Sequence, residues 1–166
     1  SSTSRGLGDV YKRQVIDILH LQLITDTKCF CTSRVVNYRH MERRNIMAKI
    51  LIVDDSKTSR KFLRNMLEQA GHEIVAEAVN GAEGVEKFRI YRPDITTMDI
   101  TMPVLGGIDA VKDIIEIDPD AKIIMVTAAG QKANMIEALK KGAADFIQKP
   151  FDMDVIVNTI EKVMEE

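Results

Sequence analysis

Cysteine is scarce in this sequence, and none lies after residue 46. Both cysteines, Cys29 and Cys31, lie early in the chain and are separated by one residue. A disulfide framework is therefore excluded for the rest of the chain, and a reducing compartment, the cytoplasm, is expected. The spacing also lacks the paired pattern of structural zinc sites, so no metal site is predicted there.

An apolar run long enough to cross a bilayer is also missing, since such a span takes about 20 predominantly apolar residues. The apolar stretch 15–24 is shorter, is interrupted by Asp17 and His20, and is not followed by a small-residue cleavage site. We therefore expect neither a transmembrane helix nor a signal peptide.

Residues 1–46 lack a sustained hydrophobic period, and their first 14 residues resemble translated adapter sequence. We expect residues 1–46 to be a disordered or non-native extension and leave them out of the fold prediction. Met47 lies three residues before the first apolar run and looks like a natural start. The main domain is therefore predicted over residues 47–166.

Positive charge is in deficit in this main domain. Residues 47–166 carry 15 Lys and Arg against 21 Asp and Glu, a net charge of −6. Binding to nucleic acid rests on neutralising phosphates, so the acidic domain gives no electrostatic case for a nucleic-acid partner.

Short apolar runs alternate with segments of helical spacing after residue 47. Five strands are predicted at 50–53, 73–79, 95–98, 122–126 and 146–147. The apolar faces of five helices are predicted at Phe62, Leu63, Met66 and Leu67, at Ala82, Val85 and Phe88, at Ile108, Val111, Ile114 and Ile115, at Met135, Ile136 and Leu139, and at Val155, Ile156, Ile160 and Val163. Ser56 is the predicted N-cap of the first helix. This alternation predicts a doubly wound α/β fold, a parallel sheet with helices on both faces.

Polar side chains follow four of the five predicted strands. Asp54 and Asp55 come after the first strand, Asp99 after the third, Thr127 after the fourth and Lys149 after the fifth. The carboxyl ends of parallel strands meet at one edge of a sheet, where ligands bind. The sequence therefore predicts that these side chains share one crevice.

A cation is expected at the three acids. Asp54, Asp55 and Asp99 would repel one another unless a cation joins them, and oxygen ligands in a partly hydrated site suit Mg2+. Adjacent acids after a strand can also cap the next helix. Capping does not explain Asp99 and Lys149 at other strand ends, so Mg2+ is the predicted cofactor.

Asp99 is the predicted nucleophile, because a carboxylate can accept a phosphoryl group, and its other reading is a third metal ligand. Lys149 supplies a positive charge for that group and Thr127 a hydroxyl donor, although a surface lysine and a strand-end threonine are also ordinary features. A cis Lys149–Pro150 bond would aim the lysine into the crevice, but the sequence leaves the isomer open. Phe146 is predicted either as a core aromatic or as a mobile side chain.

These residues, with the phrases LIVDDS, PDITTMDITMP, VTAAGQ and GAADFIQKPF, resemble the receiver domain of two-component response regulators. The resemblance covers residues 47–166 and is nearest to the stand-alone CheY type of bacterial chemotaxis. It implies a flavodoxin-like sheet of strand order 2-1-3-4-5.

The resemblance also implies a role for each site residue. Asp99 would be the phosphorylated aspartate, and Asp54 or Asp55 would hold Mg2+ together with the backbone carbonyl of Thr101. Lys149 would bind the phosphoryl group, while Thr127 and Phe146 would form the pair that moves on phosphorylation. The signalling surface would be residues 131–166.

The expected function is that of a single-domain switch that catalyses phosphotransfer only to its own Asp99 and is otherwise not an enzyme. The partners implied are a sensor histidine kinase, a flagellar motor switch protein and a phosphatase, and the protein is expected to be a monomer. No output domain is expected after residue 166, where the chain ends. The alternative is a phosphorelay intermediate that passes the group to a histidine phosphotransfer protein.

Two residues depart from side chains that speed hydrolysis in such domains. Thr101 and Ala129 lie two residues beyond Asp99 and Thr127, and neither carries an amide or acid that could orient a hydrolytic water. Slow intrinsic loss of the phosphoryl group is therefore predicted. A flavin-binding module is disfavoured, because Asp54 and Asp55 would repel a flavin phosphate.

Overall fold

A five-stranded parallel sheet forms the centre of the structure. The computed structural model describes residues 47–166, and the extension predicted over residues 1–46 lies outside the described residues. The strands are β1 (Lys49–Val53), β2 (Glu73–Ala78), β3 (Ile95–Asp99), β4 (Ile123–Thr127) and β5 (Asp145–Gln148). They lie in the order β2-β1-β3-β4-β5, and all neighbours are parallel. The α/β class and the strand order are thus confirmed.

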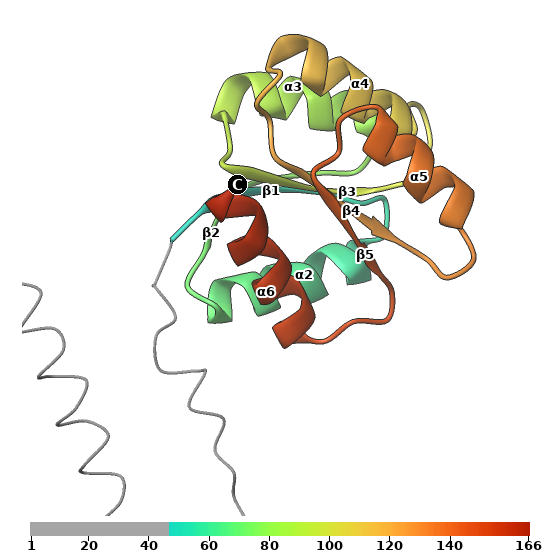
Figure 1. Cartoon of the computed structure of the whole chain (residues 1–166). Coiled ribbons are helices and arrows are strands. Elements are labelled where there is room, and N and C mark those ends of the chain that lie inside the picture. Colours follow the sequence, from blue (N-terminus) through green and yellow to red (C-terminus); the bar gives the residue numbers. More distant parts are fainter. Residues whose placement is uncertain (1–46) are drawn as a thin grey trace, which may run out of the picture. The chain divides into compact units, whose positions relative to one another are not determined.

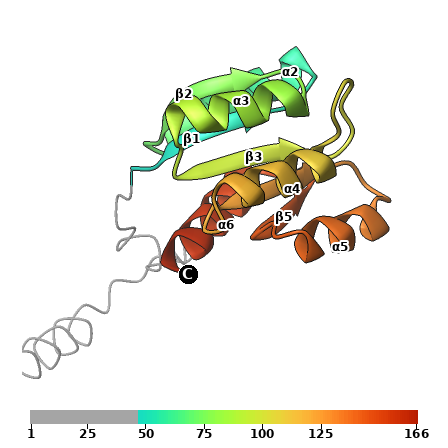
Figure 2. The same cartoon turned by 90° about the horizontal axis from the view of Figure 1, so that it is seen from above.

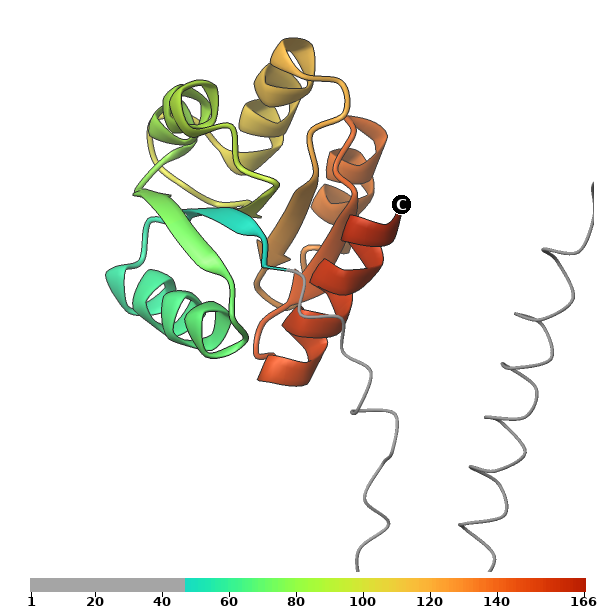
Figure 3. The same ribbon diagram turned by 90° about the vertical axis from the view of Figure 1, so that its left-hand side faces the viewer.

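Helices follow the strands and cover both faces of the sheet. Within residues 47–166 they are α2 (Lys57–Gln69), α3 (Gly81–Tyr91), α4 (Gly107–Ile117), α5 (Lys132–Lys140) and α6 (Met153–Glu165). Helices α3, α4 and α5 pack on one face of the sheet, and α2 and α6 pack on the other (Figure 1). Seen from above, α3, α4 and α5 follow one another across the sheet (Figure 2). Figure 3 shows the sheet between the two helix layers.

The strands supply both hydrophobic layers because their side chains alternate. In β1, Leu51 and Val53 belong to the core beneath α3 and α4, whereas Ile50 and Ile52 belong to the core beneath α2 and α6. All four are at most 1% exposed. A strand buried on both faces needs a continuous apolar run, which is the pattern that predicted it.

Side chains cap three of the helices. Ser56 Oγ accepts a hydrogen bond from the Ser59 amide of α2 at 3.3 Å, which confirms the predicted N-cap. Asn80 caps α3 in the same way, and Asp152 caps α6. Each cap satisfies an amide that the first helical turn leaves without an intrahelical partner.

The inner face of α3 differs from the prediction. Ala82 was predicted on that face but is exposed, and the buried residues are Gly81, Gly84 and Phe88. A Cβ at Gly84 would lie 3.0 Å from a methyl group of Val53, so the absence of a side chain lets the helix approach the sheet closely. Phe88 is buried and Val85 packs against the core as predicted. Hydrophobic spacing overlooked only the two glycines, because glycine carries no apolar side chain.

Four further apolar side chains of the predicted faces are exposed. Phe62 is 51% exposed in α2, Val155 is 45% exposed in α6, and Ile136 and Leu139 are exposed in α5. Phe62 packs against Phe151 with ring centroids 6.3 Å apart. These helices bury only a narrow stripe against the sheet, so residues at the margin of the stripe remain in contact with solvent.

Two further findings concern the isomer of the Lys149–Pro150 bond, which the sequence left open, and the prediction of no transmembrane helix. The Lys149–Pro150 peptide bond is cis. Among residues 47–166, no helix combines the length and the apolar character needed to span a bilayer.

Candidate functional site

The ends of β1 and β3 bring three acids together. Asp54 and Asp55 follow β1, and Asp99 is the last residue of β3. One carboxylate oxygen from each lies within 4.8 Å of the others. Asp54 is 1% exposed, whereas Asp55 is exposed to solvent. The predicted gathering of the acids at one sheet edge is therefore present in the structure.

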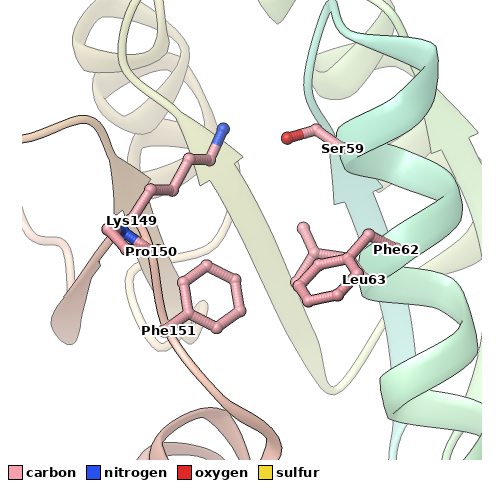
Figure 4. A pocket seen from close by; sticks show the side chains of 6 residues that line it. All are labelled: Ser59, Phe62, Leu63, Lys149, Pro150 and Phe151. Atoms are coloured by element: carbon pink, nitrogen blue, oxygen red, sulfur yellow. The ribbon is translucent and has the colours of Figure 1, made fainter.

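Lys149 is the cation of this cluster. Its Nζ lies 2.8 Å from Asp54 Oδ2 and 3.6 Å from Asp99 Oδ1. The Lys149 amide donates a 2.7 Å hydrogen bond to the Thr127 carbonyl, which ties the end of β5 to the end of β4. In Figure 4 the side chain extends past the apolar pocket of Phe62, Leu63 and Phe151, so that its amine lies beyond the apolar lining. One positive charge thus faces two of the three acids.

The surroundings of Asp99 disfavour its ionised form. Burial raises the pKa of Asp99, the charge of Lys149 lowers it, the charge of Asp54 raises it again, and the net pKa lies above the usual range. A carboxylate with a raised pKa among like charges favours the approach of a cation, which would relieve the repulsion.

A close helix contact holds Asp99 in place. Gly107, the first residue of α4, donates its amide to the Ile100 carbonyl at 2.9 Å. A Cβ at residue 107 would overlap the carbonyl of Asp99. Only glycine therefore lets α4 begin directly against the end of β3.

Thr127 and Phe146 lie on the neighbouring strands. Thr127 is fully buried, and its hydroxyl has acceptors in the Gln131 side chain at 3.2 Å and the Ala128 carbonyl at 3.3 Å. Phe146 is 39% exposed, whereas Ile147 is 2% exposed. Of the two readings of Phe146, the structure disfavours the core aromatic and places the ring at the surface.

Comparison with known proteins decides the family. The sequence profile described as "Response regulator receiver domain" matches residues 50–161. The chain belongs to the response regulator receiver domain family. Two curated relatives are the chemotaxis protein CheY of Thermotoga maritima, 52% identical over 115 residues (69% of this chain and 96% of that protein), and the CheY of Bacillus subtilis, 48% identical over 116 residues (70% and 97%).

Solved receiver domains share the fold. The response regulator domain of Thermotoga maritima CheB is 35% identical with a TM-score of 0.68, and the match covers 72% of this chain and 98% of that one. A CheX-CheY-BeF3-Mg2+ complex from Borrelia burgdorferi contains a chain that is 37% identical with a TM-score of 0.67, covering 69% and 87%. The fold and the order of its elements are therefore those of this receiver family.

The acidic cluster of this receiver domain has the donor chemistry that Mg2+ requires. Asp54, Asp55 and Asp99 offer only oxygen atoms, and the exposure of Asp55 leaves room for water ligands. Mg2+ prefers carboxylates combined with several waters. The residues present fit the ion, and the fourth predicted contributor, Thr101, lies two residues beyond Asp99 in an exposed position.

Two further residues contact this site and were not predicted from the sequence. Gln131 Nε2 donates to Thr101 Oγ1 at 3.1 Å while its Oε1 accepts from Thr127, so the side chain bridges two loops of the receiver domain. Arg60 Nη1 donates to the backbone carbonyl of Asp54 at 2.8 Å. No signal marks Gln131, whose role depends on loop conformation. Arg60 has no distinguishing signal either, because α2 also begins with a basic residue, Lys57, and basic residues on a helix are ordinarily solvated.

Proposed function

We propose that this receiver domain is a phosphorylation-dependent switch in which Asp99 accepts the phosphoryl group. The observation that carries the proposal is the convergence of Asp54, Asp55, Asp99 and the Lys149 amine at one edge of the sheet. Helix capping or core packing alone would not require three acids and an amine from three separate strand ends.

In this proposal Asp54, Asp55, Asp99 and the backbone carbonyl of Thr101 hold Mg2+. The bound ion would neutralise charge on the phosphoryl oxygens. The comparison supports this assignment, because the Borrelia burgdorferi complex is named with both BeF3 and Mg2+. The partial burial of Asp99, with 13% of its side chain exposed, restricts access to a small donor or a well-fitted partner.

With Mg2+ bound, transfer would use residues that the structure already brings together. A carboxylate oxygen of Asp99 forms a bond to phosphorus while the bond from phosphorus to the donor breaks, and the donor leaves as a free histidine side chain or, with a small acyl phosphate, as a carboxylate. The Lys149 amine, 3.6 Å from Asp99 in the structure, would then contact a phosphoryl oxygen. The Lys149 amine would then be shared between the phosphoryl group and its present partner, Asp54.

The output would depend on Thr127 and Phe146. Among the described contacts, the Thr127 hydroxyl has acceptors only on the segment that follows β4, at Ala128 and Gln131, and the new phosphoryl group would offer a stronger acceptor. Movement of Thr127 would leave space that Phe146 can enter from its present surface position. A partner with different affinity for the two states would read the change.

We further propose chemotaxis as the pathway, with a sensor histidine kinase as donor, a flagellar motor switch protein as target and a phosphatase that removes the group. Support comes from the two CheY relatives at 52% and 48% identity. The test uses beryllium fluoride with Mg2+ as a mimic of the phosphoryl group. Treated protein is expected to bind a motor switch peptide more tightly than untreated protein, and Asp99→Asn is expected not to respond.

Two other outcomes would decide against this assignment. Equal peptide binding with and without beryllium fluoride would remove the motor target. Rapid transfer of the phosphoryl group from Asp99 to a histidine phosphotransfer protein would instead identify a phosphorelay intermediate.

A further inference from the structure

Arg60 binds the backbone of the loop that carries Asp54 and Asp55. Arg60 Nη1 donates to the Asp54 carbonyl at 2.8 Å and to the Asp55 carbonyl at 3.2 Å. The Arg60 side chain is only 12% exposed. Both acceptors are backbone atoms, so the guanidinium contacts the peptide groups that orient the two acids and not their carboxylates.

Glu77 on β2 fixes this guanidinium. Arg60 Nε donates to Glu77 Oε2 at 3.1 Å, and the same carboxylate also binds Arg64. The planar guanidinium therefore uses separate N–H groups for the loop and for Glu77, which a lysine amine could not reproduce with the same geometry. The charge of Arg60 is partly offset by Glu77, which it shares with Arg64.

Other contacts hold the opposite side of the same loop. Asp54 Oδ1 accepts from the Ser56 amide at 2.8 Å, and Asp54 Oδ2 accepts from Lys149. With Arg60 on the two carbonyls, a loop of three residues between β1 and α2 has both its peptide groups and its buried carboxylate tethered. Ligands held in their binding conformation bind a cation without first losing loop entropy.

We propose that Arg60, anchored by Glu77, is a positioning residue that preorganises Asp54 and Asp55 for a divalent cation. The inference rests on the proposed function, because it assumes that the acids bind Mg2+. Partners outside the ligand set commonly set metal affinity in this way, and their loss costs about tenfold or more in affinity.

Positioning and simple charge make opposite predictions for Arg60→Gln. Removal of a positive charge next to three acids should strengthen Mg2+ binding if charge dominates. Loss of the tethers should weaken it if positioning dominates, and we expect a dissociation constant about tenfold higher. The full chain is titrated with Mg2+ alone, and binding is followed by NMR through the amide resonances of residues 54–56.

Arg64→Gln is the matched control. Arg64 lies one turn further along α2 and binds the same Glu77, but it has no described hydrogen bond to the loop. The variant therefore removes a similar charge and a similar ion pair, and its Mg2+ affinity is expected to stay within about twofold of wild type. Arg60→Lys keeps the charge, loses the planar donor geometry, and is expected to weaken Mg2+ binding as well.

A second measurement needs no metal. Amide hydrogen exchange at residues 54–56 in the presence of a chelator is expected to be faster in Arg60→Gln and Arg60→Lys than in wild type, and unchanged in Arg64→Gln. If Arg60→Gln does not fold, Arg60→Lys provides the same test of Mg2+ affinity and amide exchange.

The inference would be overturned if wild type binds Mg2+ and both Arg60 variants show the same Mg2+ affinity and the same amide exchange as wild type. Tighter Mg2+ binding by Arg60→Gln would also overturn it. Absence of Mg2+ binding by the wild type would instead overturn the proposed function, while faster exchange in the Arg60 variants would still support the positioning role.

Discussion

Replacing Asp99 with asparagine is expected to stabilise the metal-free protein. The three carboxylates lie within 4.8 Å of one another. At an effective dielectric constant of about 20, unit charges at that separation repel by roughly 3.5 kcal/mol. Lys149 Nζ lies 3.6 Å from Asp99 Oδ1, and at that distance the attraction is roughly 4.6 kcal/mol on the same scale.

Two repulsions therefore outweigh one attraction by about 2 kcal/mol, and solvent around Asp55 reduces the difference. Burial adds to the penalty, because burial is the largest cause of the raised pKa of Asp99. We expect Asp99→Asn to unfold with a free energy about 1–2 kcal/mol higher than wild type, and with a Tm about 4–8 °C higher for a domain of this size.

The pH dependence checks the sign of this prediction. The folded pKa of Asp99 lies above its unfolded value, so wild-type stability is full below the unfolded pKa and is lost as pH rises through the folded pKa. Asparagine does not titrate. The difference between the two proteins is therefore expected near neutral pH and should close below about pH 4.

Urea denaturation followed by circular dichroism, with a chelator present, measures the difference. Asp120→Asn is the matched control, because Asp120 is exposed and a surface substitution is expected to change stability by less than about 0.5 kcal/mol. An Asp99→Asn protein that is no more stable than wild type at pH 7.5 would refute the reasoning, since the acids would then not repel one another in the folded state.

Three further predictions concern the packing of α4, the pH dependence of stability and the lifetime of the proposed phosphoryl group on Asp99. Gly107→Ala should lower the free energy of unfolding by about 2–3 kcal/mol, because the new Cβ would overlap the carbonyl of Asp99; a urea midpoint equal to that of wild type would contradict this. Burial raises the pKa of Glu77, but two arginine hydrogen bonds outweigh it and the net pKa is lowered, so its contribution to stability is full above about pH 5 and is lost as pH falls through the folded pKa. The stability difference between wild type and Glu77→Gln in urea titrations should therefore shrink between pH 6 and pH 3, and a constant difference would show that Glu77 does not titrate in this way. Thr101→Asn combined with Ala129→Glu should speed loss of the phosphoryl group, since both positions are exposed and the new groups can orient a hydrolytic water; an unchanged decay of the aspartyl phosphate would show that these positions do not limit hydrolysis.

Much of the site could be predicted because a parallel sheet imposes one direction on all its strands. The position of Asp99 at the end of one apolar run and of Lys149 at the end of another was enough to place them at the same edge. Their contact in the structure, 3.6 Å between Lys149 Nζ and Asp99 Oδ1, follows from that topology.

Other parts of the structure depend on contacts that hydrophobic spacing does not encode. Gly81 and Gly84 lie with Phe88 on the inner face of α3, and a count of apolar residues selected Ala82 in place of the two glycines. The bridge made by Gln131 depends on the path of the loop after β4, which no periodic pattern describes.

The sequence identified Asp54 and Asp55 but not the contact that Arg60 makes with their backbone carbonyls. A basic residue on a helix is ordinarily a solvated surface group, and its contact with backbone carbonyls becomes visible only when the helix is placed beside the loop. Side chains that act through the backbone therefore need coordinates, whereas strand-end side chains can be read from the sequence.

The most direct test of the central claim is the intact mass of the full chain after incubation with acetyl phosphate and Mg2+. Wild type is expected to gain the mass of one phosphoryl group, and no gain is expected for Asp99→Asn or for wild type with a chelator in place of Mg2+. Folded wild type that binds Mg2+ yet gains no phosphoryl group, or an Asp99→Asn protein that gains one as readily, would contradict the assignment of Asp99 as the acceptor.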